Sequence, residues 1–377
     1  MSEWKEYKLG EICSYGKERI GVFSLTRATY ISTENMQPNR GGVVLASSIP
    51  DAGCVVAYKK DDVLVSNIRP YFKKIWLASH DGGCSADVLV FRNRENVDAR
   101  FLYYLLSADS FFDYSMATAK GTKMPRGDKN SLMEYGVKLP PLAEQRRIAE
   151  ILGALDDKIE LNSAINRNLE EQARALFKNW FIDFAPFGGN MPGDWRKGTL
   201  SEIAEFEKDK VDVSELTASS YYSTENMLPN KAGVCPAANL PNVSQTTRCY
   251  PGETIISNIR PYFKKILFCT EELAGCSTDV LCFKPRKASL AIYNYCLLCQ
   301  DDFFNYVLKG AKGTKMPRGD KSQMMKYGVC IPPEEVLQKF ASIAAPMLRL
   351  VDKNRKENRS LVEFRDTLLP KLMNGEN

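Results

Sequence analysis

The amino-acid sequence contains the same motifs twice, and this duplication constrains the fold more than any other feature. Residues 66–75 (SNIRPYFKKI) recur unchanged at 257–266, 191 residues later, and residues 119–129 (AKGTKMPRGDK) recur at 311–321, 192 residues later. A period of about 190 residues is far longer than a solenoid or propeller repeat, so each copy is a whole domain with the segment that follows it. The chain of 377 residues therefore consists of two related halves.

The residue pattern changes midway through each copy. The first part has short β-branched and aromatic runs separated by Gly, Pro, Asn and Asp, which is typical of strands, and Asp98 can cap one internal helix. After Pro140–Pro141, and again after Pro332–Pro333, the composition changes to Glu, Gln, Arg, Leu and Ala with helical periodicity. The sequence predicts an α+β fold with two tandem mixed α/β domains, residues 1–141 and 185–333, each followed by a long helix, residues 142–184 and 334–377.

An apolar heptad seam runs along each long helix, the first of which is predicted from Leu142 to about Phe181. The seams are interrupted at their centres by four asparagines: Asn162, Asn166, Asn354 and Asn358. A polar residue in such a seam fixes register and partner at some cost in stability. Antiparallel packing would place Asn162 against Asn358 and Asn166 against Asn354, so we expect the two helices to form an intramolecular antiparallel coiled coil.

The long helices have one alternative arrangement and two prolines that bear on their packing. Each helix could instead pack on its own domain, with the asparagines exposed at a kink. Pro346 and Pro370 are also expected to shorten or kink the second helix near its ends, because proline lacks the N–H that a helix interior requires. The two helices are therefore not expected to be equivalent along their whole length.

The positive charge is concentrated in the repeated motifs. The whole chain carries only +5, from 51 basic and 46 acidic residues, which does not by itself indicate a nucleic-acid binder. Each of the four motif copies carries +3, so together they carry +12 and the remainder of the chain carries −7. Cations in loops with Gly and Pro neutralise phosphates, while Arg and Asn can bind guanine and adenine edges. We therefore predict four basic patches that contact DNA.

The candidate DNA-contacting residues are the cationic, polar and aromatic residues of these motifs. In the first half they are Asn67, Arg69, Tyr71, Lys73, Lys74, Lys120, Thr122, Lys123, Arg126 and Lys129. In the second half they are Asn258, Arg260, Tyr262, Lys264, Lys265, Lys312, Thr314, Lys315, Arg318 and Lys321. The alternative is that Lys73 and Lys74 only end a strand and that residues 121–128 form an ordinary surface turn. Phe72 is expected in the core.

Motifs for catalysis or metal binding are lacking, so we assign no catalytic residue and no metal ligand. There is no GxxxxGK[ST] or GxGxxG motif, and residues 139–142 (LPPL) lack the Asp or Asn that opens the catalytic tetrapeptide of amino-methyltransferases. Cys296 and Cys299 form a lone CxxC in an apolar run and are expected in the core; His80 is the only histidine. Eleven unevenly spaced cysteines, with no apolar leader and no membrane-length segment, predict a soluble protein in a reducing cytoplasm.

Two similar domains, each followed by a long helix, resemble the specificity subunit of type I restriction-modification systems. Residues 139–184 are similar to the central conserved region of that family, most specifically at 140–145 (PPLAEQ) and 176–181 (LFKNWF). The second copy departs from this pattern, with PPEEVLQ at 332–338 and no Trp-Phe ending. The resemblance covers essentially the whole chain: target recognition domain, spacer helix, second target recognition domain and second helix.

The resemblance implies that each recognition domain binds one half of a split double-stranded DNA site and that the coiled coil sets the gap. Two modification subunits would dock on the helices and methylate adenine at N6 with S-adenosylmethionine after flipping the base, and restriction subunits would add cleavage that uses ATP and Mg. This chain would itself be no enzyme and would hold no cofactor.

The duplication adds two expectations to this picture. Pseudo-two-fold symmetry predicts half-sites in opposite orientation. The identical motifs predict related half-site sequences, with residues 37–62 and 228–253 free to differ. Two other interpretations compete with this one. The first is a scaffold that binds only protein, and the second is a self-contained nuclease or methyltransferase, which the missing catalytic motifs disfavour.

Overall fold

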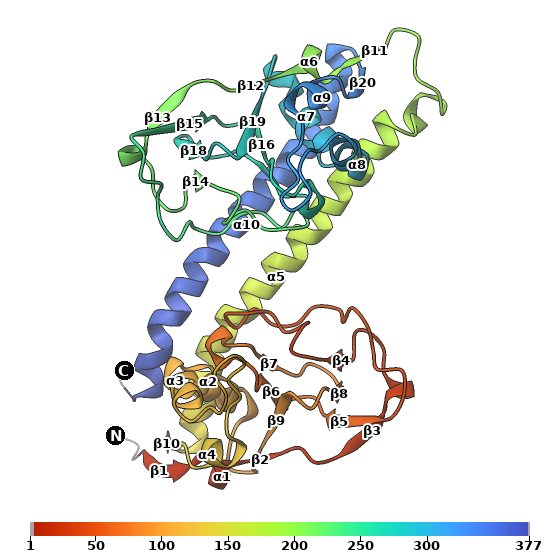
Figure 1. Cartoon of the computed structure of the whole chain (residues 1–377). Coiled ribbons are helices and arrows are strands. Elements are labelled where there is room, and N and C mark those ends of the chain that lie inside the picture. The colour runs from red at the N-terminus through yellow and green to blue at the C-terminus, as the bar shows by residue number, and fades with distance from the viewer. Residues whose placement is uncertain (1–3, 376–377) are drawn as a thin grey trace. The chain divides into compact units, whose positions relative to one another are not determined.

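The computed structural model describes residues 4–375, and the chain divides into two compact units. The first unit comprises residues 1–160 together with 358–377, and the second unit comprises residues 161–357. Each unit contains strands, short helices and one part of each long helix (Figure 1). Both long helices therefore contribute to both units.

Within the described residues, the first unit contains two four-stranded sheets and a β1–β10 pair. The sheet β2-β9-β6-β7 is antiparallel, whereas the sheet β3-β5-β8-β4 includes a parallel β4–β8 pair. The strands are β1 (Lys5–Lys8), β2 (Cys13–Tyr15), β3 (Arg19–Gly21), β4 (Tyr30–Ile31), β5 (Cys54–Tyr58), β6 (Val63–Ser66), β7 (Ile75–Leu77), β8 (Gly82–Cys84), β9 (Val88–Asn93) and β10 (Gly136–Leu139). The helical elements are α1 (Leu9–Ile12), η1 (Val22–Ser24), η2 (Pro70–Phe72), α2 (Ala99–Ser107), α3 (Asp109–Ala117) and α4 (Lys129–Met133).

The paired strands β6 and β9 are buried on both faces, which explains their continuous apolar sequences. Successive strand residues point to opposite faces. Val63, paired with Phe91, packs in one cluster with Phe101 of α2, whereas Leu64 and its partner Val90 pack in another cluster with residues of the β3-β5-β8-β4 sheet. The first unit is thus layered as helices, sheet and sheet, and this layering fixes where the chain leaves β6 at the start of the first basic motif.

The second unit has the same architecture and strand orders. Its strands are β11 (Arg196–Thr199), β12 (Ala204–Phe206), β13 (Lys210–Asp212), β14 (Tyr221–Tyr222), β15 (Gln245–Cys249), β16 (Thr254–Ser257), β17 (Ile266–Phe268), β18 (Ala274–Cys276), β19 (Val280–Pro285) and β20 (Gly328–Ile331). Its short helical elements are η3 (Ala185–Phe187), α6 (Leu200–Ile203), η4 (Val213–Glu215), η5 (Pro261–Phe263), η6 (Ala288–Leu290), α7 (Ala291–Leu298), α8 (Asp301–Lys309) and α9 (Lys321–Met325). The predicted Asp98 cap is confirmed in the first unit, where its carboxylate accepts from the Phe101 N–H at 2.9 Å; η6 occupies the corresponding place in the second.

The two long helices are α5 (Leu142–Phe181) and α10 (Glu334–Met373), each of 40 residues. The predicted extent of the first helix is confirmed. The predicted shortening of the second helix is wrong, because α10 runs through Pro346 and Pro370 without a break. Both prolines are exposed, and the turns around Pro346 are held by the buried side chains of Ala344 and Leu348. Packing on the buried face compensates for the hydrogen bond that proline removes.

Helices α5 and α10 run antiparallel within each unit, as predicted. In the first unit, residues early in α5, such as Leu152, share a core with residues late in α10, such as Leu372. In the second unit, Phe177 near the end of α5 packs on Phe340 near the start of α10, with ring centroids 6.0 Å apart. No helix among residues 4–375 has the length and apolar character needed to cross a membrane.

The asparagines lie in the seam between these helices. The predicted pair of Asn166 and Asn354 is confirmed: the Asn354 amide donates to Asn166 Oδ1 at 2.9 Å, and both side chains are buried. Asn162 donates to Glu357 at 2.9 Å, and Asn358 donates to the Ile159 carbonyl at 3.2 Å. The direct pairing of Asn162 with Asn358 stays a prediction.

Candidate nucleic-acid interface

The two repeated motifs lie against each other in each unit. In the first unit the Arg69 N–H donates to the Pro125 carbonyl at 2.8 Å, and the Gly127 N–H donates to the Asn67 carbonyl at 3.2 Å. The same two bonds recur in the second unit, from Arg260 to Pro317 at 2.8 Å and from Gly319 to Asn258 at 3.3 Å. The four predicted basic segments therefore form two surfaces, one in each unit.

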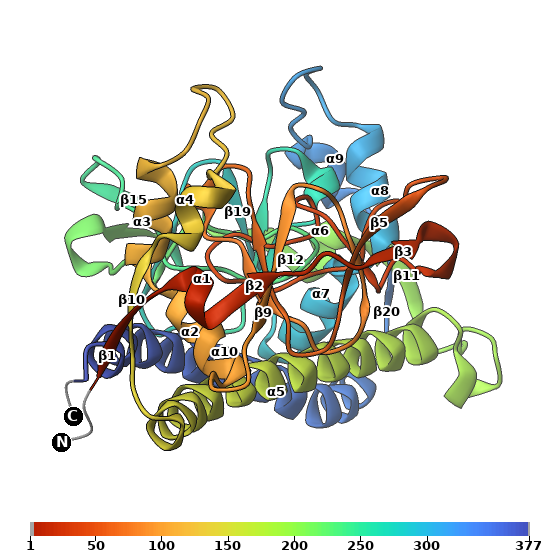
Figure 2. The same cartoon turned by 90° about the horizontal axis from the view of Figure 1, so that it is seen from below.

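One part of each surface is an exposed hairpin, which we call the basic finger (residues 120–126 and 312–318). Lys120 and Arg126 exchange two backbone hydrogen bonds of 2.9 and 3.0 Å, and Gly121 turns the chain with a φ of 92° that other residues rarely adopt. The residues Thr122, Lys123 and Met124 at the tip are exposed. In Figure 2 the loop between α3 and α4 projects from the body of the first unit, as the loop between α8 and α9 does from the second.

The other part of each surface is a tight 3₁₀ turn, which we call the aromatic turn (η2 and η5). Arg69 and Lys73 flank η2 in the left-handed region, with φ of 52° and 49°. This backbone directs Pro70 inward and leaves Tyr71 and Phe72 exposed, with their rings 4.7 Å apart. Our expectation that Phe72 lies in the core is therefore wrong. Tyr262 and Phe263 repeat this arrangement, again with rings 4.7 Å apart.

The lysines that follow the aromatic turn already have partners within the protein. Lys73 pairs with Asp109 at 2.7 Å, and Lys74 donates to the Thr33 carbonyl at 2.6 Å beside the Phe72 ring. Partial burial lowers the pKa of Lys74 below its ordinary value, although the nearby Glu34 opposes this shift. In the second unit, Lys264 pairs with Asp301 at 3.0 Å, and Lys265 donates to Thr224 at 2.6 Å. These four lysines are half-buried.

The finger cations are more exposed. Arg126 pairs with Asp87 at 3.1 Å, and Lys120 pairs with Asp128. The Lys120 ammonium lowers the pKa of the Asp128 carboxyl to about 2, together with the backbone N–H groups that Asp128 caps at the start of α4. Lys123 makes no ion pair within residues 4–375. The second unit matches: Arg318 pairs with Asp279 at 3.0 Å, Lys312 pairs with Asp320 at 3.0 Å, and Lys315 is exposed. The remaining finger residue Thr314, and the lysines Lys129 and Lys321 that begin α4 and α9, are exposed too.

The two predicted base-binding asparagines are buried beneath the fingers. Asn67 and Asn258 are 8% and 9% exposed, and neither Oδ1 has a hydrogen-bond partner within the described residues. A Cβ on Gly127 would lie 2.9 Å from the Asn67 oxygen, which explains the glycine at this position and at Gly319. In this structure the two amides are buried, and their role as base-binding residues stays a prediction. A role in positioning the finger fits their burial.

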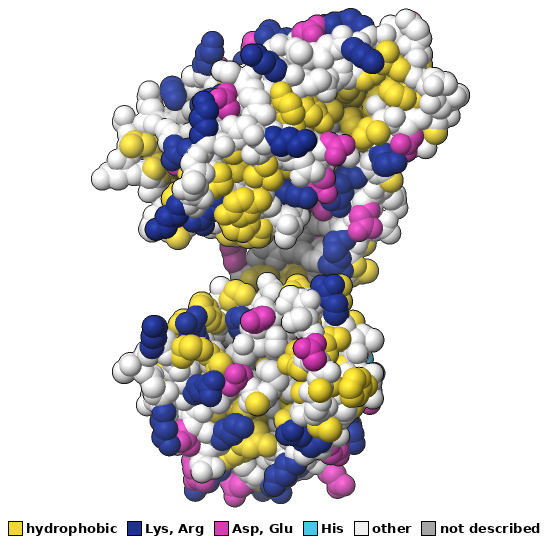
Figure 3. Space-filling view, turned by 45° about the vertical axis from the view of Figure 1, so that its right-hand side comes forward, with side chains coloured by type: hydrophobic (Ala, Val, Ile, Leu, Met, Phe, Trp, Pro, Cys, Tyr) yellow, Lys and Arg dark blue, Asp and Glu magenta, His cyan; other side chains and the backbone are white. Residues whose placement is uncertain are grey.

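Hydrophobic and charged side chains are intermixed on the face that Figure 3 shows. In Figure 3 Lys and Arg side chains are scattered among hydrophobic ones on both units, with Asp and Glu between them. This mixture agrees with the small net charge of +5.

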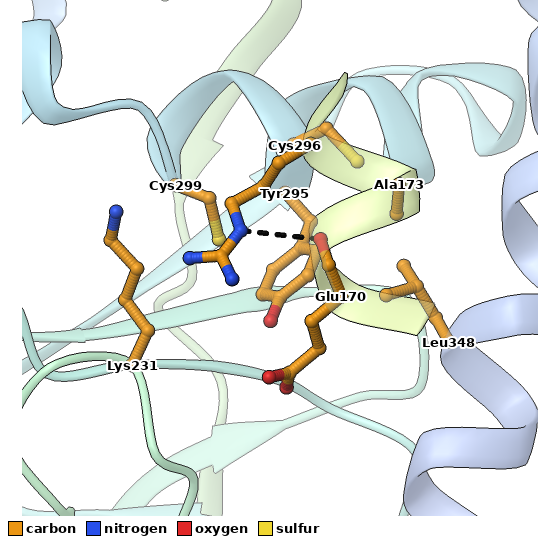
Figure 4. A pocket seen from close by; sticks show the side chains of 8 residues that line it. Glu170, Ala173, Lys231, Tyr295, Cys296, Cys299 and Leu348 are labelled. Carbon is orange, nitrogen blue, oxygen red and sulfur yellow. Dashed lines mark hydrogen bonds between the residues drawn. The ribbon is translucent and has the colours of Figure 1, made fainter. Parts of the chain in front are cut away.

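The lone CxxC motif and the histidine of the sequence both pack against apolar or aromatic neighbours. Cys296 and Cys299 are 2% and 4% exposed within the apolar core of the second unit, so the core interpretation is confirmed. Both line a small hollow that also contains Glu170, whose carbonyl accepts from Arg174 Nε at 3.2 Å (Figure 4). His80 packs against the rings of Tyr58 and Trp76, at centroid distances of 6.1 and 5.4 Å. Within residues 4–375 no group of three or more His, Cys, Asp or Glu side chains could hold a metal ion.

The sequence reasoning missed the partners of the basic motifs. These are Arg40 and the aspartates Asp87 and Asp109 in the first unit, and Lys231, Asp279 and Asp301 in the second. A signal was present, since Asp87 and Asp109 recur at an offset of 192 residues as Asp279 and Asp301. They lie outside the long identical motifs, however, and only the fold shows that they meet the cations.

Comparison with known proteins finds similarity to one family over the first half of the chain and to its members over most of the chain. Residues 1–171 match the family described as type I restriction modification DNA specificity domain. The type I restriction enzyme MjaIX specificity subunit of Methanocaldococcus jannaschii is 28% identical over 321 residues, covering 76% of this chain and 71% of that protein. The HindI specificity subunit of Haemophilus influenzae is 25% identical over 458 aligned positions, covering 100% of both. The crystal structure of the type I restriction-modification S subunit from M. genitalium has the same fold, with a TM-score of 0.63, 18% identity and coverage of 98% of this chain and 96% of that one.

Proposed function

This chain belongs to the specificity subunits of type I restriction-modification systems, and we propose that each of its two globular domains recognises one half of a bipartite DNA site. Sequence-specific DNA recognition is the role of this non-catalytic subunit. In this proposal residues 1–141 and 185–333 are the target recognition domains. Residues 142–184 and 334–377 are the spacer helices, whose antiparallel coiled coil sets the gap between the half-sites.

The observation that carries this proposal is the pairing of a basic finger with an aromatic turn in both units. An exposed finger with Lys123 and Arg126 offers cations for phosphates and one guanidinium that can bind a guanine edge. The neighbouring Tyr71 and Phe72 offer exposed rings for contacts with sugars or bases. Because the second unit repeats the arrangement with the same residue types, we propose that the half-sites are related in sequence and opposite in orientation.

The proposed partners are the other subunits of a type I restriction-modification system. We propose that two modification subunits dock on the long helices and methylate adenine at N6 with S-adenosylmethionine, and that restriction subunits add cleavage with ATP and Mg, in the cytoplasm where the DNA lies. Exposed apolar side chains on these helices support docking of a protein partner: Ile151, Leu161, Ile343, Leu350 and Phe364. This chain supplies recognition to that complex.

Methylome sequencing of a host that carries this chain with its cognate subunits tests the proposal. The expected result is one bipartite motif, methylated at adenine, with related halves in opposite orientation. Unrelated halves would contradict the shared recognition by the two fingers. A methylated motif without a gap would contradict the bipartite function itself.

Salt dependence of DNA binding separates this function from that of a scaffold that binds only protein. With roughly six to ten phosphate contacts, the affinity of the full chain for duplex DNA should fall by about 10³ to 10⁵ between about 50 and 200 mM salt. The measurement is a titration of labelled duplex at several salt concentrations. A flat response would favour the scaffold.

A further inference from the structure

In the first unit, an exposed carboxylate lies between two cations that are largely covered by the protein. Asp109 at the start of α3 accepts from both Arg40 and Lys73, the latter at 2.7 Å. The side chains of Arg40 and Lys73 are 14% and 27% exposed, whereas that of Asp109 is 64% exposed. The cations are therefore mostly covered by the protein, and the carboxylate is the member of the cluster that faces solvent.

The second unit builds the same arrangement with one different residue. Asp301 accepts from Lys231 at 2.7 Å and from Lys264 at 3.0 Å, and these side chains are 60%, 13% and 28% exposed. Lys231 stands where the first unit has Arg40. Figure 4 shows Lys231 at the edge of the hollow described above, with its ammonium group turned away from the Glu170 carboxylate. What the two copies share is two cations directed at one point near the surface.

The segments that carry the cations are held in an unfavourable backbone conformation. Asn39, Arg40 and Lys73 have φ of 54°, 60° and 49°, and the N–H groups of Asn39 and Arg40 donate to the Phe72 and Lys73 carbonyls at 2.8 and 2.9 Å. The second unit repeats all three left-handed residues, at Asn230, Lys231 and Lys264. Left-handed residues other than glycine persist where the surrounding structure requires them, and they concentrate at functional sites. Both copies thus preserve a strained geometry that places the two cations side by side.

We propose that each cation pair, Arg40 with Lys73 and Lys231 with Lys264, is a binding site for a backbone phosphate of DNA, and that Asp109 and Asp301 occupy these sites until DNA displaces them. This inference rests on the proposed function, because it assigns a ligand to the same surface. A carboxylate oxygen held by two cationic donors occupies the position that a phosphate oxygen would take. An ion pair with an exposed carboxylate is weak, whereas a phosphate contact releases counterions from the DNA. Lys73 directly follows the aromatic turn, so a phosphate bound here would lie beside Tyr71 and Phe72.

The aspartates then act as built-in competitors of DNA. Every duplex must displace them before it reaches the cation pairs, whatever its sequence. The competition lowers the affinity for all DNA alike, so a larger share of the remaining affinity must come from contacts to bases.

Removing the competing charge is the direct test. Asp109→Asn in the full chain should raise the affinity for a short duplex of mixed sequence by about 1.5- to fivefold, which is the range expected when an exposed carboxylate releases its cationic partners. The matched control is Asp113→Asn, which removes the same charge from an exposed position on the same helix that makes no ion pair within residues 4–375. In the second unit the pair is Asp301→Asn with Asp302→Asn as control. A gain no larger than the control's, or a loss of affinity, overturns the proposal.

Changing a cation should have the opposite effect. Arg40→Ala should lower DNA affinity and reduce the slope of log affinity against log salt by about 1, since one phosphate contact is lost. Arg40→Lys, which copies the residue of the second unit, should keep most of both. If Arg40→Ala leaves the slope unchanged, no phosphate binds there. If the unaltered chain shows no salt-dependent DNA binding at all, the proposed function fails, whereas equal Asp109→Asn and Asp113→Asn variants in a chain that does bind DNA reject only this inference.

Discussion

At the scale of single residues, the finger cations differ in what they already bind. Arg126 shares its charge with Asp87, while Lys123 has no ion pair within residues 4–375. Lys123 is exposed at the tip of the hairpin and the Arg126 side chain is 56% exposed at its base, and neither contributes to the core. Their removal should therefore change DNA binding with little effect on folding.

The double variant Lys123→Ala with Arg126→Ala should weaken recognition of one half-site by about 1–3 kcal/mol if Arg126 binds a base. The equivalent variant, Lys315→Ala with Arg318→Ala, should weaken recognition of the other half-site. Competition binding with duplexes altered in one half at a time measures the two effects separately. Unchanged binding in both variants would remove the fingers from the interface.

Glu253 in the second unit predicts a pH dependence of stability. Burial raises its pKa to about 7 from an ordinary value of 4.5, against the opposing hydrogen bonds from Cys282 and the Tyr250 N–H. Between those two pH values the folded chain retains a proton that the unfolded chain has released, so the free energy of unfolding falls as the pH rises, by about 1–3 kcal/mol in total. Urea unfolding at about pH 5 and about pH 8 measures the loss. Glu253→Gln should abolish this component, and an unaltered pH dependence in that variant would contradict the assignment.

At the scale of elements, the contact between α5 and α10 differs in chemistry between the units. In the first unit, Asp156 accepts from Arg365 at 2.7 Å and from the Tyr104 hydroxyl at 2.6 Å. The residues that correspond by the repeat in the second unit are Leu348, Ala173 and Cys296, and all three line the small hollow of Figure 4. The same helix packing is therefore polar in one copy and apolar in the other.

Breaking the polar version should be costly. Arg365→Ala leaves Asp156 largely buried without its cation and should lower the free energy of unfolding by about 3 kcal/mol. The combination of Asp156→Leu, Arg365→Ala and Tyr104→Phe approaches the chemistry of the second unit and should recover most of this loss, since an apolar replacement of a buried ion pair is often neutral. Urea unfolding of the full chain compares the variants. A combined loss larger than that of Arg365→Ala would contradict this view.

The elements also show what sequence could and could not predict. The helices α5 and α10 and the Asn166–Asn354 pair could be predicted because helical periodicity and the repeat offset are both visible in the sequence itself. The outward position of Phe72 could not be predicted in this way. It depends on the left-handed residues Arg69 and Lys73 around η2, and the carbonyls of this turn accept hydrogen bonds from residues 39 and 40, which are distant in the sequence. The continuation of α10 through Pro346 was missed for a similar reason, since packing on neighbouring turns outweighed a local preference.

At the scale of the whole molecule, the coiled coil is the feature that relates one recognition event to the other in our proposal. Inserting one heptad into α5 between Asn162 and Leu176, with a matching heptad in α10 between Phe340 and Asn354, lengthens the helices by about 10 Å while keeping the seam in phase. The gap between half-sites should then widen by about three base pairs, with unchanged half-site sequences. Methylome sequencing measures the gap. A three-residue insertion, which turns the seam out of phase, is the control and should abolish modification, and an unchanged gap after the heptad insertion would contradict the role of the helices.

Because both long helices belong to both units, the core of the first unit combines residues that lie far apart in the chain. Leu369, Leu372 and Met373 belong to the same core as Leu9 and Ile12, although more than 350 residues separate them in the chain. The second unit, by contrast, is built entirely from the continuous stretch 161–357. During synthesis the part that leaves the ribosome first must therefore wait for the last turns of α10 before its core closes. A chain truncated before these turns leaves the core of the first unit open, so both units are complete only after α10 has been made.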